Sequence, residues 1–178
     1  NIPFVTTWLG YDLIPTNNTL HLGHVGMSGQ RGGNLVLGYC DLLITIGSSV
    51  STSVTSTIVE NFAPNACRVN INIDESDFTH TNDFYHFNIK LDAQKAFLTL
   101  KSNSKIISIR KEWFDFCELA KFISFNEKPI QSNFIHPFLI MRLLSDISPS
   151  DTVFVIDGGG TTVYSSYQAL RPDRDQRI

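Results

Sequence analysis

The stretch Asp41-Leu42-Leu43-Ile44-Thr45-Ile46-Gly47 decides the fold class of this chain. It is almost entirely apolar, it does not alternate with polar residues, and it ends at a glycine. A strand of this kind belongs to a parallel sheet that is covered on both faces. Further short runs with strand-forming residues occupy 3–7, 68–73 and 84–89, so the sequence predicts several strands.

Helix-like stretches separate these strands. Residues 29–39 form a small-residue helix candidate, and residues 92–100 form another. Strand and helix in alternation are typical of parallel βαβ units. We therefore predict an α/β chain with a three-layer α/β/α, parallel Rossmann-like sheet. The turn-rich residues 10–24 and the Ser- and Thr-rich residues 48–57 are expected to be loops.

The second half of the chain has a different pattern. Residues 112–123 carry apolar side chains at three- and four-residue spacing, which predicts an amphipathic helix packed on a domain surface. Residues 126–133 are typical of a linker. A further helix is predicted for 136–147, with Pro137 in its first turn, and a strand for 152–156.

Composition excludes several classes of protein. The chain has 178 residues, 42% of them hydrophobic and 17% charged, with a net charge of −3. This favours a folded core, and the lack of Lys- or Arg-rich runs argues against a nucleic-acid or membrane-surface partner. Cys40, Cys67 and Cys117 are too far apart in sequence for a close metal-ligand pair, so we expect reduced, mostly buried thiols and a cytoplasmic protein.

Three stretches in the first half contain candidate ligand-binding residues. Gly23, Gly26 and Gly29 precede a predicted helix, which suits either a phosphate or tight packing of loop on helix; packing is the default. Residues 47–49 follow a strand, where open α/β sheets bind ligands, although Gly47 also permits a sharp turn. Residues 74–75 offer carboxylates that suit either a ribose hydroxyl or a cap.

Histidines show no metal-site pattern. The five histidines lack the spacing of metal ligands, so ordinary surface or core roles are expected for each.

A glycine-rich loop in the second half is the strongest local signal. Asp157-Gly158-Gly159-Gly160-Thr161-Thr162 follows the predicted strand and precedes the helix-like residues 163–170. Amides and hydroxyls in this arrangement suit an anion. The loop resembles the Asp-Gly-Gly-Thr phosphate loop of sugar kinases of the actin-like ATPase fold, which bind ATP. In that family, however, the loop opens the domain and much more chain follows.

The order of motifs resembles the central domain of acetolactate-synthase-like thiamine-diphosphate enzymes. The similar residues, at a spacing that is specific to that family, are 3–10, 22–29, 41–47, 62–66 and 70–74. The resemblance covers residues 1–95 well and 96–147 loosely. Residues 150–178 resemble the opening of the family's C-terminal diphosphate-binding domain.

This resemblance implies a larger parent enzyme that uses thiamine diphosphate and Mg²⁺ to act on 2-oxo acids by decarboxylation and carboligation, as a transferase or lyase. The cofactor acts as ylid and electron sink. The family's first domain supplies a glutamate and its third a Gly-Asp-Gly motif for Mg²⁺; neither is found in this chain. We expect the chain itself to be structural and non-catalytic.

The same resemblance divides the chain into three parts. Residues 1–125 correspond to the central domain, whose six-stranded sheet would lack its first strand and helix, residues 126–149 to a linker and helix, and residues 150–178 to the start of the C-terminal domain. Expected partners are the missing N- and C-terminal domains of the same polypeptide and further copies in a dimer or tetramer. Without sheet neighbours, residues 150–178 are expected to bury little and to be poorly ordered.

Two departures from the family concern cofactors. Flavin-dependent members carry Met-His-Gly and Arg-Phe-Asp where this chain has Met27-Ser28-Gly29 and Ser49-Val50-Ser51. Loss of the arginine removes a phosphate partner, which favours a central domain without FAD. The family's Val-Gly-Gln-His corresponds to residues 158–161, so thiamine diphosphate contacts would rest on the amides of Gly158 and Gly160 and on Thr161. A stand-alone nucleotide- or flavin-binding module is the alternative.

Overall fold

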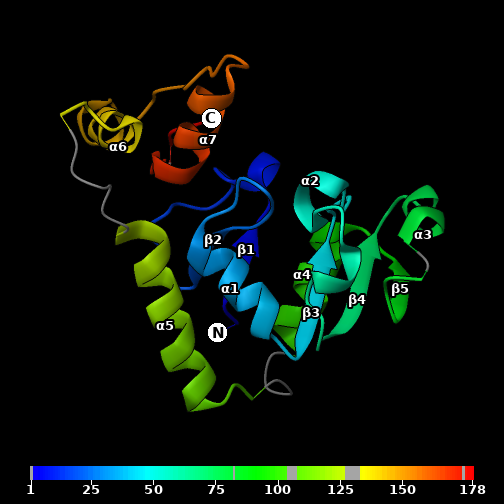
Figure 1. Ribbon diagram of the computed structural model, residues 1–178. Helices are drawn as coiled ribbons and strands as arrows, with labels where there is room; N and C mark the ends of the chain where they lie inside the picture. The colour runs from blue at the N-terminus through cyan, green and yellow to red at the C-terminus, as the bar shows by residue number, and fades with distance from the viewer. Residues whose placement is uncertain (1, 82, 104–107, 127–132, 174) are drawn as a thin grey trace.

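The computed structural model describes residues 2–81, 83–103, 108–126, 133–173 and 175–178. Its helices and strands alternate along the chain, with two short 3-10 helices (η) among them (Figure 1). In chain order they are β1 Phe4–Thr6, η1 Trp8–Gly10, β2 His21–His24, α1 Arg31–Tyr39, β3 Leu42–Ile46, α2 Thr52–Thr55, η2 Val59–Asn61, β4 Cys67–Asn72, α3 Ser76–Thr81, β5 Phe87–Lys90, α4 Ala93–Ser102, α5 Lys111–Asn126, α6 Pro137–Ile147 and α7 Gly160–Ala169.

All strand pairs among the described residues are parallel. Strands β1 and β2 form one sheet, and β3, β4 and β5 form a second sheet in that order. Figure 1 shows the two sheets side by side, flanked by helices. The predicted parallel, Rossmann-like α/β class is therefore confirmed, with the difference that its strands lie in two sheets rather than one.

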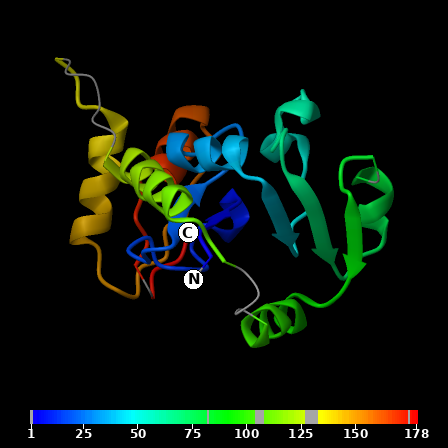
Figure 2. The same cartoon turned by 90° about the horizontal axis from the view of Figure 1, so that it is seen from below.

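Strand β2 lies between two layers of helices. On one face, Leu22 packs with Val36 of α1 and Ala120 of α5 in a buried cluster. Figure 2 shows α1 and α5 lying next to each other over this face. On the other face, His24 contacts Tyr167 of α7, with ring centroids 6.2 Å apart. This arrangement places the C-terminal helix against the N-terminal sheet.

Helices α1 and α5 approach so closely that a side chain at Gly32 does not fit. A Cβ atom at Gly32 would overlap with the carbonyl oxygen of Ala120. Beside this contact, the Ser124 hydroxyl donates to Leu22 O at 2.8 Å and accepts from Gly33 N at 3.1 Å. One side chain of α5 therefore joins β2 to the first turn of α1.

Two segments that were predicted to be loops contain regular structure. Residues 10–24 include strand β2, and residues 48–57 include the short helix α2. The glycine in β2 concealed the strand, since Gly23 adopts φ +110°, which other residues rarely do. The linker predicted at 126–133 lies mainly in residues 127–132, outside the described residues.

The strand predicted at 152–156 is wrong. A single parallel bridge joins Val153 to Arg177, and the Val153 and Val155 side chains are 64% and 93% exposed. A β-branched sequence forms a strand only where a neighbouring strand accepts its hydrogen bonds. The expectation of little burial holds for this stretch, but it is wrong for α7, where Ser165, Ser166 and Ala169 are buried.

Buried thiols and the lack of a spanning helix match the composition. Cys40 and Cys117 are free and buried, whereas Cys67 is exposed. Burial raises the pKa of both buried thiols to about 11, so they are protonated and unreactive at neutral pH. Within the described part of the chain, no helix is both long and apolar enough to cross a membrane.

The contact between α1 and α5 can be tested with two glycines of the same helix. We expect Gly32→Ala to lower the free energy of unfolding by about 2 kcal/mol or more, because the added methyl group collides with α5. Gly38→Ala is the matched control, since a Cβ there meets no atom within 4 Å. It should stabilise the chain by about 0.5–1 kcal/mol, as alanine does in a helix. Urea denaturation measures both, and equal stabilities would contradict the packing described.

Candidate functional site

The glycine-rich stretch of residues 23–29, which begins in β2, serves packing. A Cβ at Gly23 would overlap with the side-chain oxygen of Gln30, which accepts from His24 N at 3.1 Å. The amide of Gly33, in the first turn of α1, is taken by Ser124. Protein groups thus fill the space and use a donor that a phosphate would need. Of the two readings of residues 23–29, the structure fits tight packing.

A polar cluster lies at the carboxyl ends of β3 and β4. The Asp77 carboxylate accepts from the Ser49 hydroxyl at 2.6 Å and from Asn72 Nδ2 at 3.1 Å. Asn70 is fully buried, and its Oδ1 accepts from the Thr45 hydroxyl at 3.1 Å. The cluster is therefore bonded internally, and its charged group is a carboxylate.

Asp74 takes the role of a cap rather than that of a ligand. Its carboxylate accepts from Ser76 N at 2.8 Å, and the hydrogen bonds from Ser76 hold the pKa of the Asp74 carboxyl below its usual value. The acid that reaches the strand ends is Asp77. Asp77 was not predicted from the sequence, although Arg68, Asn70 and Asn72 alternate with apolar residues along β4, which is a signal that polar partners lie on that face.

Two buried histidines occupy the other face of β2. His21 and His24 are both fully buried, and the bend at Gly23 places them on the same side of the chain. Their rings contact Phe4, Tyr11, Phe125 and Tyr167, and we call these six residues the aromatic–histidine cluster. Desolvation lowers the pKa of both histidines to about 4, so both are neutral at pH 7. The expected core role is confirmed for these two.

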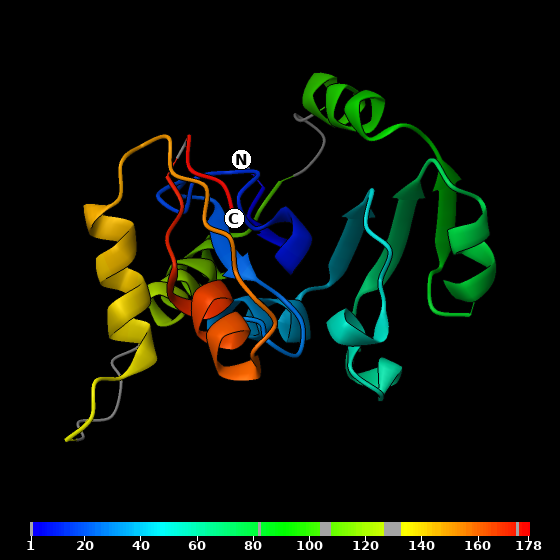
Figure 3. The ribbon, with the colours of Figure 1, turned by 90° about the horizontal axis from the view of Figure 1, so that it is seen from above.

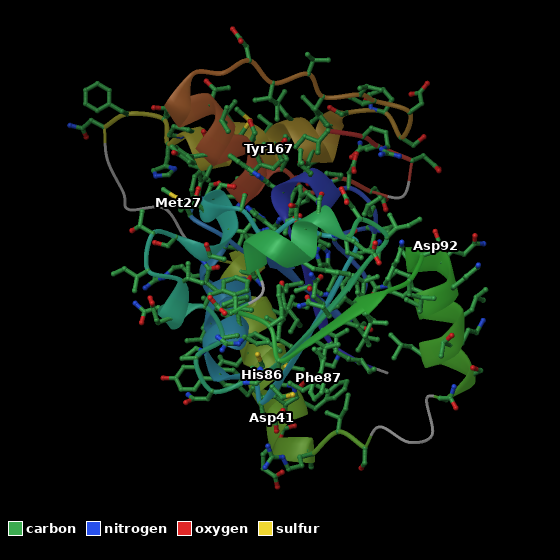
Figure 4. All side chains as sticks on the ribbon, turned by 90° about the vertical axis from the view of Figure 1, so that its right-hand side faces the viewer. Met27, Asp41, His86, Phe87, Asp92 and Tyr167 are labelled. Atoms are coloured by element: carbon green, nitrogen blue, oxygen red, sulfur yellow. The ribbon has the colours of Figure 1, made fainter. Side chains whose placement is uncertain are left out.

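The aromatic–histidine cluster also holds the C-terminal segment. The Tyr11 hydroxyl donates to Leu170 O at 2.6 Å, and burial raises the Tyr11 pKa well above its usual value. Gln30 Nε2 donates to Gln168 O at 3.2 Å. Tyr167, labelled in Figure 4, projects from α7 onto Trp8, with ring centroids 5.4 Å apart.

The predicted anion-binding residues lie together on the loop that begins α7. Gly158, Gly160 and Thr161 are all exposed, and no side chain caps this helix. A Cβ at Gly158 would meet no atom within 4 Å. Asp157 Oδ1 accepts from Gly158 N at 2.7 Å, which occupies one of the loop amides.

Residues 1–100 match the family model described as "Thiamine pyrophosphate enzyme, central domain". The chain belongs to this family. Thiamine pyrophosphate and thiamine diphosphate are the same compound, so the resemblance found in the sequence is confirmed.

Individual relatives extend the similarity along the chain. It is 30% identical to a probable acetolactate synthase large subunit of Methanocaldococcus jannaschii over 176 residues, which cover 93% of this chain and 29% of that protein. It is 25% identical to the acetolactate synthase large subunit of Buchnera aphidicola, over 98% of this chain and 31% of that protein. It is 26% identical to the acetolactate synthase large subunit of Lactococcus lactis, over 89% of this chain and 27% of that protein. The chain thus spans about three tenths of the length of these curated relatives.

The thiamine family implies a diphosphate and a metal ion, and the chain's residues fit the two differently. Backbone amides in the first turn of α7 and the Thr161 hydroxyl are donors that suit a phosphate group, with open space at Gly158. Among the described residues, however, no three His, Cys, Asp or Glu side chains gather in a way that could hold a metal ion. The loop fits the anion, whereas metal ligands would have to come from elsewhere.

The internal bonding of the strand-end cluster predicts unequal roles for two nearby acids. Asp77→Ala should lower the free energy of unfolding by about 1–3 kcal/mol, because the buried Asn72 amide and the Ser49 hydroxyl lose their shared acceptor. Asp74→Ala, which removes an exposed cap, should lower the free energy of unfolding clearly less. Thermal unfolding of both variants tests this, and a larger loss for Asp74→Ala would refute the arrangement.

Proposed function

We propose that this chain is the structural, non-catalytic middle part of a thiamine-diphosphate- and Mg²⁺-dependent enzyme that acts on 2-oxo acids by decarboxylation and carboligation. The observation that carries the proposal is the family match over residues 1–100, together with large subunits named acetolactate synthase that align over nearly the whole chain. The chain's contribution is to join domains and to position the loop at α7. In the whole enzyme, further copies would form a dimer or tetramer in the cytoplasm.

We propose the same three-part division of the chain. Residues 1–125 form the central domain, residues 126–149 a linker and helix, and residues 150–178 the beginning of the diphosphate-binding domain. An exposed apolar stripe along α6 supports this, since such a face normally packs on further structure. It consists of Leu139, Ile140, Leu143, Leu144 and Ile147. The exposed Val153 and Val155 would pair with strands of the same domain.

The two sheets would be parts of one sheet. Strands β1 and β3 each have an edge without a partner among the described strands. Val5 of β1 and Leu43 of β3 pack against the same buried cluster. A strand contributed from outside this chain, inserted between β1 and β3, would complete one parallel sheet over that cluster.

Bound thiamine diphosphate would supply a carbanion nucleophile and an electron sink. The residues of this chain would only bind it: the amide of Gly160 and the Thr161 hydroxyl would donate to one phosphate group, and the Gly158 amide would join them by giving up its bond to Asp157. The Mg²⁺ ligands and the glutamate would come from the other domains. The central domain would hold no FAD, because Ser49 stands where a phosphate-binding arginine would be needed and is bonded to a carboxylate.

Ligand titration separates this proposal from its alternatives. We expect the purified chain to show no saturable binding of FAD, NAD⁺ or ATP below about 1 mM by isothermal titration calorimetry. A Kd of about 1 mM corresponds to a binding free energy of about −4 kcal/mol. The reason is that the loops that would hold their phosphates are filled by packing or lack cations. Saturable FAD binding would identify a stand-alone flavin module, and saturable ATP binding that Gly158→Ala weakens would indicate a kinase-like loop.

Hydrogen exchange tests the completed sheet. In a parallel ladder, alternate residues direct their amides to opposite neighbours. Gly47 N donates to Ile71 O, so the Leu42, Ile44 and Ile46 amides point away from β4. We expect these three to exchange rapidly in this chain and slowly in the longer enzyme, with Ile71 in the middle strand protected in both. Rapid exchange of Ile44 in the longer enzyme would exclude the inserted strand.

A further inference from the structure

The C-terminal segment is fastened to the N-terminal sheet chiefly through its backbone. Tyr11 donates to Leu170 O, Gln30 donates to Gln168 O, and the amide of Thr16 donates to Pro172 O at 3.3 Å. Arg171 also donates to the carbonyl oxygen of Phe125. These bonds form only while α7 lies against β2, so whatever disturbs that contact releases several of them together.

His24 lies inside this contact. Its ring meets Tyr11 edge-on, with centroids 4.9 Å apart at 71°, and it also contacts Tyr167 of α7. His24 Nε2 donates to Ser28 O at 2.9 Å, which leaves Nδ1 as an acceptor that is buried and has no hydrogen-bond partner. A proton on Nδ1 would therefore create a buried charge, which is costly and which the Ser28 carbonyl and the Gln30 side chain offset only in part.

His21 lies beside it and faces α5. Its ring stacks on Phe4 at 5.3 Å and meets Phe125 edge-on. The carbonyls of Gly23 and Pro15 favour its charged form slightly, but burial, Lys121 and His24 oppose it. A proton on His21 therefore disturbs the same set of contacts from the β1 and α5 side.

Among the residues that the structure describes, the charged groups around the pair offer no compensation. Lys121 from α5 and Arg171 from the C-terminal segment are both cations, and they act on His21 and Tyr11 respectively. The carboxylate nearest along the N-terminal segment, Asp12, is already paired with Arg177 at 2.7 Å. Accepting a proton thus adds positive charge to an apolar site flanked by positive charge.

We propose that His21 and His24 form an acid-sensitive latch, which holds α7 against β2 when neutral, and with α7 the Gly158–Thr161 loop at its start, and releases them when protonated. The direction of the pH dependence follows from the burial of the two rings. Since the docked state lowers the pKa of both histidines to about 4 from an ordinary 6.5, docking is complete above about pH 6.5 and is lost as the pH falls towards 4. Figure 3 shows α7 beside the N-terminal sheet. Once α7 is released, the loop at its start would lose its fixed position relative to that sheet.

The test is hydrogen exchange of the whole chain, read residue by residue by NMR at several pH values and corrected for the intrinsic rate. We expect protection of the α7 amides at 164–170 to fall at least about tenfold between pH 7 and pH 5, while β4 amides keep theirs. The His24 ring of the docked state should stay mostly neutral over this range and titrate only towards pH 4 in the same spectra. Protection of α7 that persists until β4 also opens, or a His24 ring that titrates near 6.5 while α7 stays protected, would overturn the proposal.

Variants distinguish a pH dependence caused by the histidines from one caused by Asp12. His24→Phe keeps an aromatic ring that cannot be protonated and should remove most of the pH dependence. Asp12→Asn and His86→Gln, which alter a carboxylate at the tail and an exposed histidine elsewhere, should leave it intact. If Asp12→Asn abolishes the effect, the tail ion pair is the switch and the latch is wrong. Should His24→Phe not fold, His21→Phe and the wild-type ring titration decide the question. None of these readings depends on thiamine diphosphate, so they are independent of the proposed function.

Discussion

The close contact of α1 with α5 at Gly32 is the constraint on which the rest of the structure depends. Because Gly32 has no side chain, α5 comes near enough for Ser124 to bond both Leu22 of β2 and Gly33 of α1. The same approach brings Ser124 O within 3.3 Å of Gln30 Nε2. Gln30 in turn bonds His24 and Gln168, so the position of the C-terminal helix follows from the packing of two helices that are distant from it in sequence.

Local patterns predicted those parts of the fold that local physics decides. The apolar run at β3 and the helix that Asp92 caps were found close to their observed bounds, because periodicity and capping act over a few residues. Strand β2 was missed because its burial comes from α5 and α7, which begin 87 and 136 residues after His24, the last residue of the strand (111 − 24 and 160 − 24). The stretch 152–156 has the right residues for a strand, but among the described residues its only bridge is the one to Arg177, and propensity alone does not make a strand.

Site prediction succeeded to a similar extent and for similar reasons. Gly158, Gly160 and Thr161 were expected together because they are adjacent in sequence, and they do lie together at the start of α7; what they bind remains a prediction. Asp77 and the His21–His24 pair depend on long-range contacts, so no short motif marks them. The chain's membership in the thiamine family came from the order of several motifs, each of which is weak alone.

The central claim is that this chain works as the middle part of a thiamine-diphosphate enzyme, and the most direct measurement is the sequence of its reading frame on both sides. We predict an upstream domain that carries the glutamate, and downstream a Gly-Asp-Gly motif followed ~25–30 residues later by Asn-Asn, the set that binds Mg²⁺ and the diphosphate. Stop codons close to both ends would contradict the claim, because the chain would then have to act without the residues that the chemistry requires.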